Sequence, residues 1–218
     1  MNTAKEAILA RVSSALADVP PAETSNDVPL PRLYRTVDES PRAHIIEQFA
    51  DRVAEYNAKV RRVNAAVLPQ AIAEACRARG VARLAVPADL PPGWTPEGIT
   101  LIRDPGLTID QLETSDGVLT ACALGIAQTG TIVLDSGPGQ GRRILTLLPD
   151  YHLCVVFEEQ IVGLVPEAIA RLAPVSQRPI TFISGPSATS DIELNRVEGV
   201  HGPRTLEVLV VAPELKDA

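Results

Sequence analysis

The sequence has few of the residues that build metal centres. Its three cysteines, Cys76, Cys122 and Cys154, are odd in number and far apart, which argues against a disulfide framework and against a CxxC metal or cluster site. The three histidines form no HxxxH or HExxH pattern. We therefore predict no metal site, and we expect each cysteine to pack as a small apolar residue in the core.

Lysine is also scarce, because Lys5, Lys59 and Lys216 are the only three and none lies between positions 60 and 215. Any anion bound by the central part of the chain would therefore have to be held by arginine or by backbone N–H groups. The net charge of -7 and the pI of 5.0 provide no long-range attraction to nucleic acid or to anionic lipid. We expect partners of neither kind.

Long apolar runs are missing as well. No uninterrupted apolar segment approaches the ~18 residues of a membrane span, and the N-terminal segment has scattered charges in place of the apolar run of a signal peptide. The expected location is the cytoplasm. Apolar residues make up 45% of the chain but aromatic residues only 3%, so the core is expected to consist mainly of Ala, Val, Leu and Ile.

The chain is predicted to have two parts, residues 1–40 and 41–218. Thr3 and Glu6 form a capping-box pattern before an amphipathic helix that extends to about Ala17. Five prolines between positions 19 and 41 then predict an extended tether. Ser40 as N-cap and Pro41 at the first helical position predict that the second part begins with a helix.

Residues 41–218 show the alternation of an α/β domain. After the first helix come a strand at KVRRV, a helix over about 68–79 and a strand at RLAVP. Further strands are predicted at ITLI, GVLTACALGIA, TIVLD, YHLCVVF, ITFIS and LEVLVV, with helices capped by Thr108 and over 166–172 and 190–196. These apolar runs are typical of strands covered on both faces, so we predict an open sheet that is mixed or mainly parallel.

The first candidate site is the loop after ITFIS, with the sequence SGPSATSDIE. Backbone N–H groups and the start of a helix can hold an anion at the carboxyl end of a strand. Ser190 and Glu193 also fit a capping box, so pure helix capping is nearly as good an explanation. The residues proposed to contact a ligand are Gly185, Ser187 and Thr189.

The second candidate is SGPGQGRR, which follows TIVLD and contains Gly139, Arg142 and Arg143. Glycines allow close approach of a backbone to an anion, and an arginine fork can hold a carboxylate or a phosphate. No nucleotide motif is matched, and a flexible hairpin loop explains the sequence about equally well. The turn that leads into this strand, Thr129, Gly130 and Thr131, is included among the ligand-binding candidates.

The third candidate is the loop GVHGP, which contains His201 and Gly202. A loop histidine can act as an acid, a base or a ligand, although a lone histidine is more often structural. If the loops converge, three carboxylates could act with His201, and they complete the set of catalytic candidates: Glu158, Asp191 and Glu193.

At these motifs the chain resembles the lactate-utilisation protein C family, the stand-alone LUD domain. The resemblance is carried by AQTGTIVLDSG, LLPDYHLCVV, SGPSATSDIE and VEGVHGPRTLEVLVV, and it spans about residues 43–211. It implies the fold shared by NagB, RpiA and the coenzyme A transferases. It also implies a role in the oxidation of L-lactate to pyruvate beside iron-sulfur protein partners.

Three scattered cysteines cannot supply a four-cysteine cluster, so any iron-sulfur centre is expected on another chain. We therefore expect a subunit of a lactate-oxidising assembly with no cofactor of its own and a small anionic ligand. One alternative is an independent enzyme of the same fold class: a coenzyme A transferase, a sugar-phosphate isomerase or an ATP-dependent folate cyclo-ligase. Another is a pure interaction module with no ligand. The lack of an internal lysine weighs against the isomerase and the ligase, and a transferase would need Glu158 or Glu193 as its nucleophile.

Overall fold

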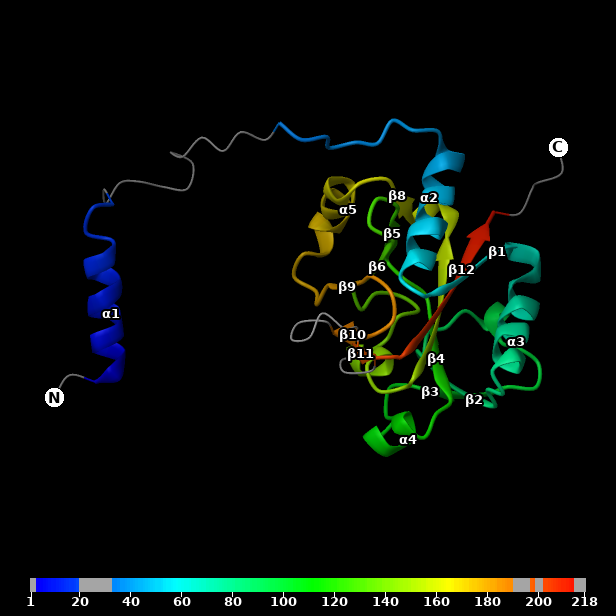
Figure 1. Cartoon of the computed structure of the whole chain (residues 1–218). Helices are drawn as coiled ribbons and strands as arrows, with labels where there is room; N and C mark the ends of the chain where they lie inside the picture. The colour runs from blue at the N-terminus through cyan, green and yellow to red at the C-terminus, as the bar shows by residue number, and fades with distance from the viewer. Residues whose placement is uncertain (1–2, 20–32, 190–196, 199–201, 214–218) are drawn as a thin grey trace. The chain divides into compact units, whose positions relative to one another are not determined.

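The computed structural model describes residues 3–19, 33–189, 197–198 and 202–213. The chain divides into two units, Met1–Tyr34 and Arg35–Ala218 (Figure 1). In the first unit, helix α1 (Ala4–Ala15) begins at Thr3, and the predicted capping box with Glu6 is present. Its apolar side chains are exposed within this unit: Ile8, Leu9, Val12 and Leu16.

The second unit is built on a six-stranded parallel sheet in the order β1-β12-β7-β4-β2-β3. The bounds are β1 Lys59–Asn64, β12 Thr205–Ala212, β7 Tyr151–Phe157, β4 Gly117–Thr120, β2 Arg83–Val86 and β3 Thr100–Arg103. The central strands β7 and β12 are buried along nearly their whole length. The predicted α/β class with a mainly parallel sheet is confirmed.

A second, four-stranded sheet that the sequence did not predict packs on one face of the first. It has the order β8-β5-β6-β9, with β8 Ile161–Val162, β5 Leu124–Ile126, β6 Thr131–Leu134 and β9 Thr181–Ile183. We predicted one strand over GVLTACALGIA, and this is wrong. The backbone changes partner between the two halves, because Ala121 N donates to Gly139 O and Ala123 N donates to Val133 O.

Alternating side chains divide the core into layers. On one face of the large sheet, Leu153 and Val155 of β7 pack against α3 (Leu68–Ala78). On the other face, Cys154 and Val156 pack against α2 (Arg42–Glu55) and the small sheet. Helix α5 (Val165–Leu172) covers the outer face of the small sheet, so α3 and α5 lie on opposite sides of the unit (Figure 1).

Two helix starts can be compared with their predicted caps. Helix α4 (Ile109–Glu113) has the predicted capping box between Thr108 and Gln111. Helix α2 begins differently from the prediction, because its N-cap is Pro41 and not Ser40.

The predicted helix over 190–196 lies outside the described residues. The other pieces are β10 Ala188–Thr189, β11 Val197–Glu198 and the 3-10 turns η1 Ala65–Val67, η2 Pro92–Trp94, η3 Arg143–Thr146, η4 Glu158–Gln160 and η5 Ala173–Val175. Within the described ranges, no helix has the length and apolar character that a membrane crossing requires.

Replacing Gly130 by alanine should destabilise the second unit strongly. Gly130 has φ +58°, and an added Cβ would lie 2.6 Å from the carbonyl carbon of Arg52 on α2. The left-handed backbone at position 130 should cost alanine about 1–2 kcal/mol of stability. Overpacking of the added methyl group against Arg52 should cost about 1–3 kcal/mol more. Gly98→Ala is the matched control, since Gly98 has φ +77° and nothing within 4 Å of the added atom. Urea unfolding of both variants measures the difference, and equal losses of stability would show that the contact with α2 is not tight.

Candidate functional site

A pocket of about 200 Å³ lies at the amino-terminal ends of β7 and β12. Its floor includes His152 and Leu206, which are paired across the two strands. Segments 184–187, after β9, and 202–203, before β12, form its walls together with η3. Apolar surface comes from Phe182, Ile183, Pro186 and Pro203, and polar groups come from Arg143, Thr146, Ser184 and Ser187.

Arg143 is the cationic residue among the described residues that line this pocket. Its Nη1 donates to the carbonyl oxygen of Thr146 at 3.0 Å and to Thr146 Oγ1 at 2.6 Å, which fixes one edge of the guanidinium. Burial lowers the pKa of Arg143, but from so high a value that the side chain stays charged. No carboxylate among the described residues forms an ion pair with it. Its other N–H donors can therefore serve an anion.

The loop after β9 is held in place from two sides. Ser184 Oγ lies 2.8 Å from Thr131 Oγ1, and Ser187 N donates to Pro203 O at 2.8 Å. Gly185 has φ +84° and packs against Tyr56, whose Cβ would lie 2.5 Å from an added Cβ. The structure thus brings Gly185, Ser187 and Gly202 together with Arg143 around one pocket, although the sequence places them in three separate motifs.

Arg142 is not part of this group. Its Nε donates to Asp104 Oδ2 at 2.7 Å and its Nη2 donates to Asp104 Oδ1, which makes a bidentate ion pair. The hydrogen bond from Arg142 lowers the pKa of Asp104, and Asp104 is buried, so the pair has a structural role. Arg142 and Arg143 both border a neighbouring cavity of about 470 Å³, but only Arg143 also reaches the 200 Å³ pocket.

The glycine loop after β6 is closed by carboxylates of this chain. Gly139 N donates to Asp89 Oδ2 at 2.9 Å, and Gly137 N donates to Asp135 Oδ1 at 3.0 Å. These N–H groups would otherwise have been the ones available to an anion. Gly139 is also absent from the described lining of the pocket, and of this motif only Arg143 contributes to it.

The turn before β6 supports the pocket without lining it. Thr129 Oγ1 and Thr131 Oγ1 are 2.7 Å apart, and Thr131 reaches the pocket only through Ser184. Gly130 provides the close contact with α2 described above. This turn joins the small sheet to α2 and to the loop after β9.

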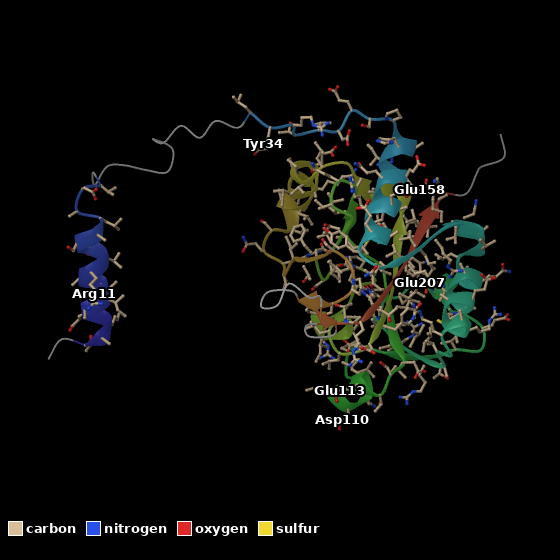
Figure 2. The ribbon with its side chains drawn as sticks, in the orientation of Figure 1. Arg11, Tyr34, Asp110, Glu113, Glu158 and Glu207 are labelled. Carbon is tan, nitrogen blue, oxygen red and sulfur yellow. The ribbon has the colours of Figure 1, made fainter. Side chains whose placement is uncertain are left out.

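The catalytic candidates do not assemble in the described part of the structure. Glu158 follows β7 at its carboxyl end and pairs with Arg62 at 2.8 Å. Glu158 lies six residues beyond His152 along an extended strand, which places it roughly 20 Å from His152 in the pocket floor. Figure 2 shows Glu158 and Asp110 of α4 at opposite ends of the unit. Asp191, Glu193 and His201 lie outside the described residues. Thr189 belongs to β10, and its side chain is also outside the description.

His152 is a pocket residue that sequence reasoning did not select. It is buried, and its Nε2 lies 2.8 Å from Thr120 Oγ1 on β4. The signal in the sequence is a polar residue within the apolar run YHLCVVF, which is predicted above only as a strand. Among the described residues, no group of three or more His, Cys, Asp or Glu side chains is placed to hold a metal ion.

Known proteins resemble the chain over most of this unit. Residues 104–211 match the LUD domain. The lactate utilization protein C of Deinococcus radiodurans is 51% identical over 173 residues, which cover 78% of this chain and 81% of that protein. The protein of the same name from Shouchella clausii is 37% identical over 114 residues, which cover 50% of this chain and 49% of the relative.

A solved structure agrees with these matches. The crystal structure of a DUF162 family protein from Deinococcus radiodurans has a TM-score of 0.69 and 45% sequence identity, and the match covers 79% of this chain and 99% of that one. Similarity in sequence and in fold therefore points to the same group, and this chain belongs to the lactate utilization protein C family, with a LUD domain over residues 104–211.

Proposed function

We propose that this chain is a subunit of an assembly that oxidises L-lactate to pyruvate, and that it binds a small anionic ligand in the pocket beside Arg143. Membership of the lactate utilization protein C family supports a role in lactate utilisation. The observation that supports ligand binding is the guanidinium of Arg143, which borders the pocket and forms no ion pair among the described residues.

The pocket lining suits a short carboxylate. Arg143 can hold a carboxylate group in a two-point contact, and Thr146, Ser184 and Ser187 are polar residues of the same lining. Phe182, Ile183 and Leu206 provide an apolar wall for a short carbon chain. A volume of about 200 Å³ accommodates a compact acid.

The electrons are proposed to leave through iron-sulfur partner proteins. Oxidation of a 2-hydroxy acid releases two electrons, and the three cysteines of this chain are fewer than the four that a cluster uses. An independent transferase would need Glu158 or Glu193 as its nucleophile. Glu158 is paired with Arg62 at the far end of β7, and Glu193 lies outside the described residues.

Titration of the purified chain tests the ligand part of this proposal. Isothermal calorimetry with L-lactate, pyruvate and inorganic phosphate in turn should show saturable binding of a short carboxylate at one site per chain. Thermal unfolding should shift upward with the same ligand, since binding to the native state stabilises it. If none of the three compounds gives heat or a thermal shift, the pocket does not bind a small anion.

A further inference from the structure

His152 lies in the floor of the pocket with one ring nitrogen already engaged. Its side chain is 1% exposed, and its Nε2 lies 2.8 Å from Oγ1 of Thr120, which is fully buried. The sheet holds the two side chains together, because Val118 of β4 pairs with His152 of β7, and Thr120 pairs with Cys154, the next residue of β7 on the same face. The Nε2 edge of the imidazole is therefore turned toward β4.

The other ring nitrogen, Nδ1, is open to the pocket. In the part of the chain that the structure describes, Nδ1 has no hydrogen-bonding partner, yet it is not one of the buried atoms left without a partner, which are Arg61 Nε and Glu207 Oε1. Nδ1 is thus not sealed in the core, and the open space that His152 borders is the pocket. Since buried polar groups are normally hydrogen-bonded, we expect the pocket's occupant to supply the second hydrogen bond.

Two other polar side chains of the lining are engaged within the chain. Thr146 Oγ1 accepts from Arg143 Nη1 at 2.6 Å and donates to the carbonyl oxygen of Arg143 at 3.2 Å. Ser184 Oγ lies 2.8 Å from Thr131 Oγ1. Arg143 and His152 differ from them, because each has a nitrogen left for an occupant of the pocket. One small volume thus contains a cation for a carboxylate and an imidazole nitrogen for a second polar atom.

These two groups suit an acid that carries an oxygen on the carbon next to its carboxylate. The two polar parts of such an acid are adjacent, so a compact pocket can contact both. If Thr120 donates to Nε2, Nδ1 carries the proton and donates to that oxygen, and if Nε2 donates to Thr120, Nδ1 accepts from a hydroxyl. The apolar side chains of Ile183 and Leu206 remain for the methyl group.

We propose that His152 is a specificity-determining residue, which hydrogen-bonds through Nδ1 to the C2 oxygen of a 2-hydroxy or 2-oxo acid. The inference rests on the proposed binding of a carboxylate by Arg143, and it adds the substrate class and the residue that recognises it. Propionate has the same carbon chain as lactate but no oxygen at C2, so it would leave Nδ1 without a partner. A site built to hydrogen-bond a ligand oxygen discriminates against an analogue that lacks it.

Calorimetric titration of the full chain with L-lactate, pyruvate and propionate tests the proposal. We expect L-lactate to bind the wild-type chain about threefold to tenfold more tightly than propionate, the worth of one hydrogen bond. His152→Phe removes both ring nitrogens and keeps a ring of similar size, so the affinity for L-lactate should fall to that for propionate, which should not change. A purely structural role would weaken binding of all three acids together.

His44→Phe is the matched control, because His44 is exposed on α2 and does not border the pocket. It should keep the preference for L-lactate over propionate. Equal affinities for these two acids in the wild-type chain would overturn the inference and leave the anion site intact. Binding of none of the three acids would overturn the proposed ligand site and this inference with it. A preference for L-lactate that survives in His152→Phe would also overturn the inference.

Nitrogen NMR of the histidine side chains gives a second test that does not depend on the folding of a variant. The Nδ1 signal of His152 in the wild-type chain should move when L-lactate is added and should move less with propionate. The signal of His44 should stay in place with both acids. A His152 signal that responds equally to the two acids, or to neither, would overturn the proposal.

Discussion

Deleting the gene for this chain is expected to stop growth on L-lactate and to leave growth on pyruvate unchanged. The expectation follows from the proposed position of the chain in the oxidation of lactate, upstream of pyruvate. Since the chain has too few cysteines for a cluster of its own, its contribution is expected to depend on the assembly. The measurement compares growth rates of the deletion strain and the parent on each carbon source.

The comparison requires a strain without a second copy of the gene. Expression of the chain from a plasmid should restore growth on L-lactate, which excludes an effect on neighbouring genes. Normal growth of the uncomplemented strain on L-lactate would contradict the assignment. A defect on both carbon sources would point to a role outside lactate oxidation.

Arg143→Ala is expected to weaken binding of the carboxylate ligand by roughly tenfold or more. Loss of a hydrogen-bonded charged partner typically costs about 1.5–3 kcal/mol of binding free energy. The fold should remain intact, because the described contacts of Arg143 are with Thr146 in the same turn. Calorimetric titration of the wild-type chain and the variant with the same carboxylate measures the change in affinity.

Arg142→Ala is the matched control for this variant. Arg142 is the adjacent residue, and it is engaged with Asp104 at 2.7 Å and does not border the pocket. Its loss should lower stability by leaving Asp104 without its partner, while the ligand affinity stays close to that of the wild-type chain. Equal affinities for Arg143→Ala and the wild-type chain would remove Arg143 from the site.

The main strands could be predicted because burial on both faces leaves a clear signal. The runs that became β7 and β12 are apolar without alternation, as expected for central strands of a covered parallel sheet. The division of residues 117–126 could not be predicted in this way. Both halves are apolar and buried, and the break at Ala121–Ala123 depends on hydrogen bonds to Gly139 and Val133.

The site was predicted in part, since Gly185, Ser187, Gly202 and Arg143 came from separate motifs and meet at one pocket. The sequence around the two adjacent arginines does not show that Arg143 lines the pocket and that Arg142 does not. That difference depends on Asp104, which is 38 residues away and becomes a partner only in the fold. For the same reason, the sequence does not show that Glu158 pairs with Arg62, which is 96 residues away and becomes a partner only in the fold.

Lactate-dependent dye reduction in extracts of the deletion strain tests the central claim most directly. Extract without the chain should show no activity, and the purified chain alone should also show none. Addition of the wild-type chain or of Arg142→Ala should restore dye reduction, and Arg143→Ala should restore less of it when lactate is limiting. Full activity in the extract that lacks the chain, or dye reduction by the purified chain alone, would contradict the claim that it acts as a ligand-binding subunit of a lactate-oxidising assembly.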